Sequence, residues 1–95
     1  MENLLDLIEE NNGKLLLKFS AKWCGPCKRY APIFDDFTIE NPDVKSFSID
    51  CDEFPDIAQK FSVMSIPCTI VLDNKNEVKR EYGILQKNEI QKLLE

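Results

Sequence analysis

Histidine is absent from this chain of 95 residues, and glycine is scarce. The three glycines form no Gly-x-Gly-x-x-Gly fingerprint, so nothing in the sequence is suited to bind a flavin or a nicotinamide. No apolar run approaches the ~20 residues that cross a bilayer. We therefore expect no bound cofactor and no membrane partner.

Basic residues are outnumbered by acidic ones, and the formal net charge is −5 at pH 7. An acidic body does not attract nucleic acid or an anionic membrane, so neither is expected as a partner. The acids are scattered except for one cluster, which could be a docking patch but is better explained as a solvated loop and helix start. The cluster comprises Asp50, Asp52, Glu53 and Asp56.

Length and the first residues predict one small intracellular domain. Ninety-five residues leave room for a single core, so residues 1–95 are expected to form one domain, acting as a monomer. The segment from Met1 to Asp6 carries acids where a signal peptide would carry bases. This predicts a cytoplasmic location, in which thiols stay reduced.

Two cysteines stand one helical turn apart in Trp23-Cys24-Gly25-Pro26-Cys27-Lys28, after an apolar strand and before an amphipathic run. Gly25 permits the turn, and Pro26 suits the first helical position, where an N–H is not needed. A helix start lowers the pKa of a thiol, so Cys24 is the expected nucleophile. Cys27, in the first turn and facing back, is the expected resolving thiol.

The alternative for any Cys-x-x-Cys pair is half of a zinc site. Structural zinc needs four ligands, and this chain offers no histidine and only the separate Cys51 and Cys68 besides the pair. We therefore expect no metal and favour a redox pair.

The segment Ala21–Lys28, with Ser65-Ile66-Pro67 much later, resembles the thioredoxin family over nearly the whole chain. The resemblance implies a protein-disulfide reductase, in which the Cys24 thiolate attacks a substrate disulfide and Cys27 releases the product as a Cys24–Cys27 disulfide forms. It also implies regeneration by a thioredoxin reductase that draws on NADPH. Gly-Pro between the cysteines resembles the strongly reducing members of the family, whose reduction potential is about −270 mV, rather than the disulfide isomerases, at about −180 mV.

Two other functions stay open on the same fold. A disulfide oxidase or isomerase would need a less reducing pair, and a non-catalytic binding module would keep the cysteines without turnover. The expected partners under the first interpretation are disulfide-containing proteins and the reductase.

The pattern of apolar residues predicts an α/β fold with helices on both faces of a mixed sheet of four strands. Thioredoxins usually begin with a further edge strand, which has no counterpart here because Met1 falls almost at the first helix. Asn12-Gly13 is predicted to cap that helix in a left-handed conformation. The expected strands are Leu15–Ser20, Val44–Asp50, Thr69–Asp73 and Glu77–Tyr82, the last two joined as a hairpin across Asn74-Lys75. The helix after the cysteines is expected to stop at Asn41-Pro42, and later helices begin near Pro55 and Lys87.

Substrate contact is expected from the apolar surface beside Cys24. Trp23 directly precedes the nucleophile, which favours contact over burial in the core. Ile66 precedes Pro67, which matches the family's cis proline and would leave the Ile66 backbone free to pair with a substrate strand. Gly83 resembles the glycine near the family's substrate groove.

Lys18 is the sharpest departure from the family, which usually places a buried aspartate there, behind the cysteines. The lysine that commonly accompanies that aspartate aligns with Ser46. An inward Lys18 amine would accept the Cys27 proton or favour a thiolate, whereas a snorkelling side chain would only pack its stem. Cys68 replaces the usual threonine after the proline, and we expect a small buried thiol that does not pair with Cys51.

Overall fold

A computed structural model of the chain describes residues 3–95. Met1 and Glu2, which contribute to the expectations about the amino terminus, lie outside these residues. Within residues 3–95, no helix has both the length and the apolar composition that crossing a membrane requires.

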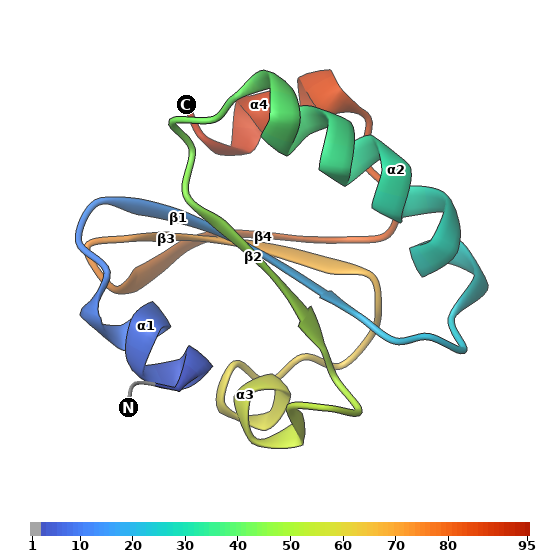
Figure 1. The fold of residues 1–95 in the computed structure, drawn as a ribbon, viewed down its shortest axis with the longest axis horizontal. Coiled ribbons are helices and arrows are strands. Elements are labelled where there is room, and N and C mark those ends of the chain that lie inside the picture. Colours follow the sequence, from blue (N-terminus) through green and yellow to red (C-terminus); the bar gives the residue numbers. More distant parts are fainter. Residues whose placement is uncertain (1–2) are drawn as a thin grey trace.

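A mixed sheet of four strands forms the middle layer (Figure 1). Its order is β2-β1-β3-β4, with β1 parallel to β2 and antiparallel to β3, and β3 antiparallel to β4. β1 and β3 are therefore central strands. The strands are β1 (Lys14–Ser20), β2 (Ser46–Asp50), β3 (Cys68–Asp73) and β4 (Asn76–Tyr82).

Helices cover both faces of the sheet, as predicted. In Figure 1, α2 and α4 lie on one side of the strands, and α1 and α3 lie on the other. The helices are α1 (Leu4–Glu10), α2 (Gly25–Glu40), α3 (Pro55–Lys60) and α4 (Lys87–Leu93). The predicted α/β architecture with four strands is thus confirmed over the described residues.

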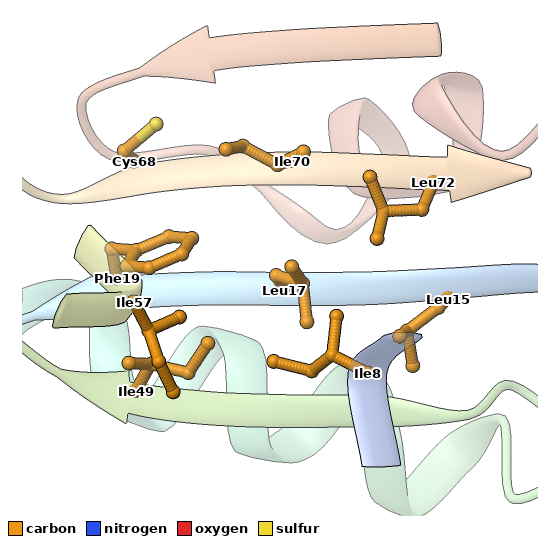
Figure 2. Close-up of a cluster of buried hydrophobic side chains, with 9 residues drawn as sticks. All are labelled: Ile8, Leu15, Leu17, Phe19, Ile49, Ile57, Cys68, Ile70 and Leu72. Atoms are coloured by element: carbon orange, nitrogen blue, oxygen red, sulfur yellow. The ribbon is translucent and has the colours of Figure 1, made fainter. Parts of the chain in front are cut away.

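The central strand β1 separates two cores because its side chains alternate between the faces. Leu15, Leu17 and Phe19 point to the α1/α3 face, where every buried member of the cluster is apolar (Figure 2). Leu16 packs on the α2/α4 face with aromatic side chains of α2. The first cluster comprises Ile8, Leu15, Leu17, Phe19, Ile49, Ile57, Cys68, Ile70 and Leu72.

The α2/α4 face combines an apolar cluster with polar groups. Its buried apolar residues are Leu16, Tyr30, Phe34, Phe37, Val71, Leu85, Ile90 and Leu94. The hydroxyl of Tyr30 hydrogen-bonds Oγ1 of Thr69 at 2.8 Å, and Lys18 lies on the same face because it pairs with Thr69 across β1 and β3. The face that carries the cysteine helix is therefore the face that contains buried polar groups.

The predicted left-handed cap of the first helix is wrong. α1 ends at Glu10, and the next residue, Asn11, has an extended backbone conformation. Gly13 does have a positive φ of 81°, but it serves a separate turn, where its N–H donates to Asn74 Oδ1 and its carbonyl accepts from the Asn74 N–H. The β3–β4 turn, distant in sequence, therefore fixes this backbone conformation.

Smaller differences concern the ends of elements. β2 begins at Ser46 rather than Val44, because Val44 donates its N–H to Asn41 in a turn. The predicted hairpin turn is confirmed at Asn74 and Lys75, which both have positive φ. α2 ends at Glu40 as expected from Asn41-Pro42, and it continues through Pro32.

Candidate active site

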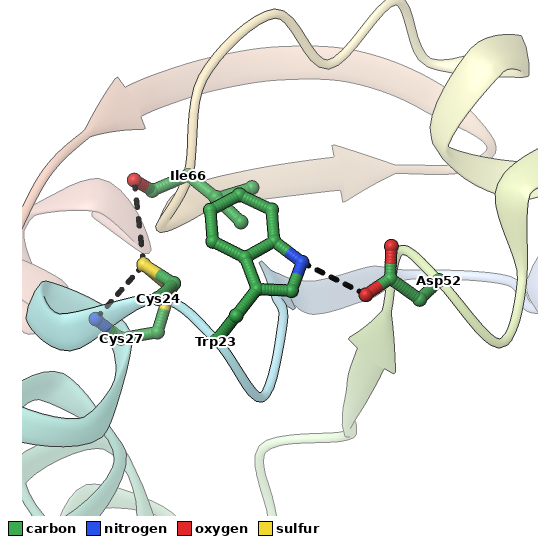
Figure 3. The surroundings of a disulfide bond; sticks show 5 residues. All are labelled: Trp23, Cys24, Cys27, Asp52 and Ile66. Carbon is green, nitrogen blue, oxygen red and sulfur yellow. Dashed lines mark hydrogen bonds between the residues drawn. A yellow bond between two sulfur atoms is a disulfide. The ribbon is translucent and has the colours of Figure 1, made fainter.

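The Cys24–Cys27 pair lies where β1 passes into α2, and the two residues form a disulfide in this structure (Figure 3). Cys24 is the N-cap of α2, and its Sγ accepts the backbone N–H of Cys27 at 3.2 Å. Pro26 occupies the first turn, where its missing N–H costs no hydrogen bond. An N–H directed at the Cys24 sulfur, together with the positive end of the helix dipole, favours a thiolate in the reduced protein.

A groove of about 530 Å³ opens beside Cys24. Trp23 and Ile66 belong to its wall together with the cysteine, whereas Pro67 and Gly83, which were also expected at the substrate surface, do not. Cys27 is absent from this wall and contacts a smaller depression on the other side, near Lys28. The wall comprises Trp23, Cys24, Gly25, Pro26, Cys51, Ala58, Val63, Met64, Ser65 and Ile66.

Exposure alone does not distinguish the two cysteines. Cys24 is 5% exposed and Cys27 is 4% exposed in the disulfide form. The difference lies in their surroundings, because Cys24 borders the larger groove and Cys27 does not.

Trp23 is 70% exposed, which agrees with a contact surface rather than a core residue. Its indole Nε1–H donates to Asp52 Oδ2 at 2.8 Å, and this bond orients the ring beside Cys24 (Figure 3). Asp52 is held in turn by Asp50, whose Oδ1 accepts the Asp52 N–H at 2.8 Å. Two members of the acidic cluster thus have a local structural role in orienting the indole.

The peptide bond between Ile66 and Pro67 is cis, as the family resemblance implied. The carbonyl oxygen of Ile66 lies 3.9 Å from the Cys24 sulfur, so the backbone of this loop faces the reactive atom. Pro67 is buried below the groove, and its carbonyl accepts the N–H of Gly83 at 2.8 Å. Gly83 has a φ of 95°, which favours glycine, and it supports the loop without being part of the groove wall.

Lys18 points to the α2 face and is 5% exposed. Its Nζ lies 5.1 Å from the centroid of the Phe34 ring, a cation–π contact. Burial lowers the pKa of Lys18, and the nearby Asp35 carboxylate acts in the opposite direction. The amine thus lies beside Phe34, which is two helical turns beyond Cys27.

The other two cysteines are free thiols. Cys68 is fully buried in the α1/α3 core, and burial raises its pKa to about 11. Cys51 is half-buried in the groove wall, and burial raises its pKa, with a further contribution from Asp50 and Asp52. Both thiols are therefore kept protonated at neutral pH, and the absence of a Cys51–Cys68 bond agrees with prediction.

No group of three or more histidine, cysteine, aspartate or glutamate side chains in residues 3–95 is arranged to hold a metal ion.

Sequence reasoning missed Asp52 as the partner of Trp23 and missed much of the groove wall. Segments far from the Cys24–Cys27 pair in the sequence contribute to that wall, with Cys51, Val63 and Met64. The side chain of Met64 is 86% exposed. No local pattern identifies such residues, because loops after β2 and α3 bring them to Cys24 only in the folded chain. The signal in the sequence was the position of Met64 directly before Ser65-Ile66-Pro67.

Comparison with known proteins agrees with this geometry. The family model described as thioredoxin matches residues 1–95. Thioredoxin from Chlamydia trachomatis is 38% identical over 93 residues, covering 98% of this chain and 89% of that protein. Thioredoxin from Bacillus subtilis is 39% identical over 87 residues, covering 90% and 84%.

A solved structure extends the similarity to three dimensions. The X-ray structure of Fasciola hepatica thioredoxin superposes with a TM-score of 0.86 at 32% identity, covering 96% of this chain and 88% of that one. The chain therefore belongs to the thioredoxin family and is a thiol–disulfide oxidoreductase that reduces protein disulfides through Cys24 and Cys27.

Proposed function

We propose that Cys24 is the attacking thiol and Cys27 the resolving thiol of this reductase, and that substrates lie in the groove beside Trp23 and Ile66. The observation that carries this assignment is the position of Cys24, which caps α2 and borders the groove. Cys27 lies in the first turn of the same helix, outside that groove wall. A substrate disulfide in the groove therefore meets the Cys24 sulfur first.

The reaction proceeds by two exchanges of sulfur–sulfur bonds. The Cys24 thiolate attacks one sulfur of the substrate disulfide, a Cys24–substrate bond forms, and the other substrate sulfur leaves as a thiolate and takes a proton from water. Cys27 then loses its proton and attacks Cys24, whose bond to the substrate breaks. The substrate has gained two electrons, and the protein has become the Cys24–Cys27 disulfide.

The groove supplies contacts of two kinds. Trp23, Met64 and Ile66 offer apolar surface, and the Ile66 carbonyl faces the site, where it can accept an N–H from an extended substrate segment. The N–H of Gly83 donates to the carbonyl of Pro67, and this bond holds the backbone next to Ile66 in place. The substrate class is therefore a protein segment with an accessible disulfide.

The oxidised pair is restored by an external donor, which we propose is a thioredoxin reductase that uses NADPH. The Gly-Pro sequence between the cysteines and the family membership support a reducing role in the cytoplasm, as a monomeric single domain that carries electrons to its substrates. Reduction of this protein by NADPH in the presence of a bacterial thioredoxin reductase, followed at 340 nm, tests that partner. No NADPH consumption with any such reductase would contradict it.

Trapping tests the roles of the two cysteines. Cys27→Ser is expected to hold substrate proteins as stable mixed disulfides on Cys24, because the resolving attack is lost, and insulin reduction with dithiothreitol should fall to background. The matched control is the Cys24→Ser/Cys27→Ser double variant, which should capture nothing. Equal capture by Cys24→Ser alone would reverse the assignment.

Alkylation of the reduced protein gives a second, independent measurement. We expect iodoacetamide to label Cys24 well below the pH at which a free thiol reacts, while Cys27 remains protected. Equal labelling rates for the two cysteines would contradict the proposed difference between them.

A further inference from the structure

The buried polar groups of the molecule gather behind the redox pair. Among residues 3–95, the buried polar side chains are Lys18 and Thr69, together with the hydroxyl of Tyr30. Lys18 faces Thr69 across β1 and β3, and Thr69 bonds Tyr30 of α2. Tyr30 is one helical turn beyond Cys27.

Burial disfavours the charged form of the Lys18 amine, whereas the Phe34 ring and the Asp35 carboxylate favour it. The face of the Phe34 ring, 5.1 Å from Nζ, attracts an ammonium but offers nothing comparable to a neutral amine. No side-chain nitrogen or oxygen of the described residues is completely buried without a hydrogen bond, so Nζ keeps contact with water. Phe34 is itself fixed by an edge contact with Tyr30, at 5.9 Å between ring centroids.

We propose that Lys18 is a positioning residue whose positive charge favours the thiolate forms of the reduced Cys24–Cys27 pair and so makes the protein a weaker reductant than it would be without that charge. The inference rests on the proposed function of the pair. It adds a residue that sets the equilibrium and the pH dependence of the exchange without touching the substrate.

Distance decides between direct proton transfer and an electrostatic effect. Seven residues of helix separate Cys27 from Phe34, which corresponds to about 10 Å along the axis. Proton transfer requires contact at about 3 Å, and the contact that Lys18 Nζ makes is with the Phe34 ring, so the proposed effect is electrostatic and involves no proton transfer. A unit charge at about 10 Å, with an effective dielectric of about 20, still changes a thiol ionisation constant roughly tenfold.

The groups around Lys18 leave its charge as the dominant one on that face. From α2, Asp35 and Tyr30 face it, from β3 the non-ionising Thr69, and from β2 Ser48 stands opposite in register. Asp35 is exposed, so water screens its carboxylate. Tyr30 stays neutral because burial raises its pKa to about 12.

The charge acts on one side of the redox equilibrium. Oxidation removes two electrons and two protons from the dithiol and yields an uncharged disulfide, whereas the dithiol can ionise. A nearby cation stabilises the ionised dithiol and leaves the disulfide unaffected, so the reduced form gains. Removal of the cation should make the protein more reducing and should move thiol ionisation to higher pH.

The test compares Lys18→Met with Lys18→Arg, which keeps the charge, and with Lys92→Met, which removes an exposed lysine of α4. Equilibration with glutathione at a pH above the thiol pKa of both proteins should show that the equilibrium constant for reducing the Lys18→Met disulfide is about tenfold lower than that of the wild type, and the difference should disappear well below that pKa. The thiolate absorbance at 240 nm should titrate about one unit higher in the same variant. Lys18→Arg and Lys92→Met should both stay close to the wild type.

A Lys18→Met protein whose glutathione equilibrium and thiolate titration equal those of Lys92→Met would overturn the proposal. Circular dichroism and a urea titration establish that each variant is folded, and Lys18→Gln provides a second neutral variant to which the same criteria apply. If the wild type itself failed to reduce insulin, the proposed function would fall, whereas normal reduction with an unchanged Lys18→Met equilibrium would refute only the role of Lys18.

Discussion

The two faces of the sheet use the same strand for different purposes. On the α1/α3 face, β1 contributes Leu15, Leu17 and Phe19 to a core whose buried members are all apolar. On the α2/α4 face, the same strand contributes Leu16 and Lys18, and a hydroxyl pair lies beside the lysine. The α1/α3 face stabilises the fold through burial of apolar side chains. The α2/α4 face buries polar groups as well, between the sheet and the redox helix, and so gains less stability from apolar burial.

Neighbouring substitutions on β1 test that difference most strongly. Leu17→Ala should lower the free energy of unfolding by about 2–5 kcal/mol, because it leaves a cavity in a fully buried apolar cluster. Lys18→Met should change it by less than about 1 kcal/mol, or raise it, since an apolar side chain of similar size replaces a buried charge. Urea titrations measure both, and a larger loss for Lys18→Met would invert the comparison.

Alkaline pH should reveal one titrating group on each face. Burial raises the pKa of Cys68 from 9.0 to about 11 and that of Tyr30 from 10.0 to about 12. Each folded group holds its proton where the unfolded group has lost it, so its contribution to stability is complete below the unfolded pKa and disappears as pH rises through the folded one. Each should account for a loss of up to about 3 kcal/mol, over pH 9–11 for Cys68 and pH 10–12 for Tyr30.

Variants separate the two alkaline windows. Cys68→Ala should flatten the dependence of unfolding free energy on pH between 9 and 11, and Tyr30→Phe should flatten it between 10 and 12. Each variant is compared with the wild type, and Cys68→Ala also removes the contribution of Cys68 to the raised pKa of Tyr30. Identical pH profiles for both variants and the wild type would show that neither group contributes.

The buried Tyr30–Thr69 hydrogen bond should be worth more than an exposed one. Tyr30→Phe and Thr69→Val each leave a buried hydroxyl without a partner and should cost about 1–2 kcal/mol. The double variant should cost little more than either single one, because it removes both hydroxyls together. Urea titrations of the four proteins measure this coupling, and strict additivity would show that the bond contributes nothing.

The exposed Trp23–Asp52 bond completes the series with the smallest effect on stability. Trp23→Phe and Asp52→Asn should each change the free energy of unfolding by less than about 1 kcal/mol, because water replaces the lost partner. Both should raise the KM for insulin a few-fold, since the ring beside Cys24 loses its orientation. An unchanged KM would remove Trp23 and Asp52 from the substrate surface.

Local signals in the sequence predicted the central features of this fold. The apolar run of β1 indicates a strand buried on both faces, and Pro26 after Cys24 indicates the start of α2, because both depend on residues close together in the chain. The hairpin across Asn74 and Lys75 follows from the same kind of evidence, and the structure adds that both residues have positive φ. The four strands and their flanking helices could therefore be predicted before any contact was known.

Contacts between distant segments were beyond the reach of such signals. The backbone conformation of Gly13 depends on its hydrogen bonds with Asn74, and the orientation of Trp23 depends on Asp52 in the loop after β2. The groove wall likewise draws on residues after α3. Each of these requires the packed sheet to bring the partners together, and side-chain spacing alone does not encode them.

By itself, the sequence determined that two thiols stand one turn apart at the start of a helix and that a lysine occupies the strand behind them. Only the tertiary structure decided where that lysine directs its charge. Packing of α2 on the sheet placed the Phe34 ring beside the Lys18 amine. The physical reason is that the period of a strand fixes which face a side chain occupies, whereas the atoms it meets there are set by the register and position of the helix packed against it.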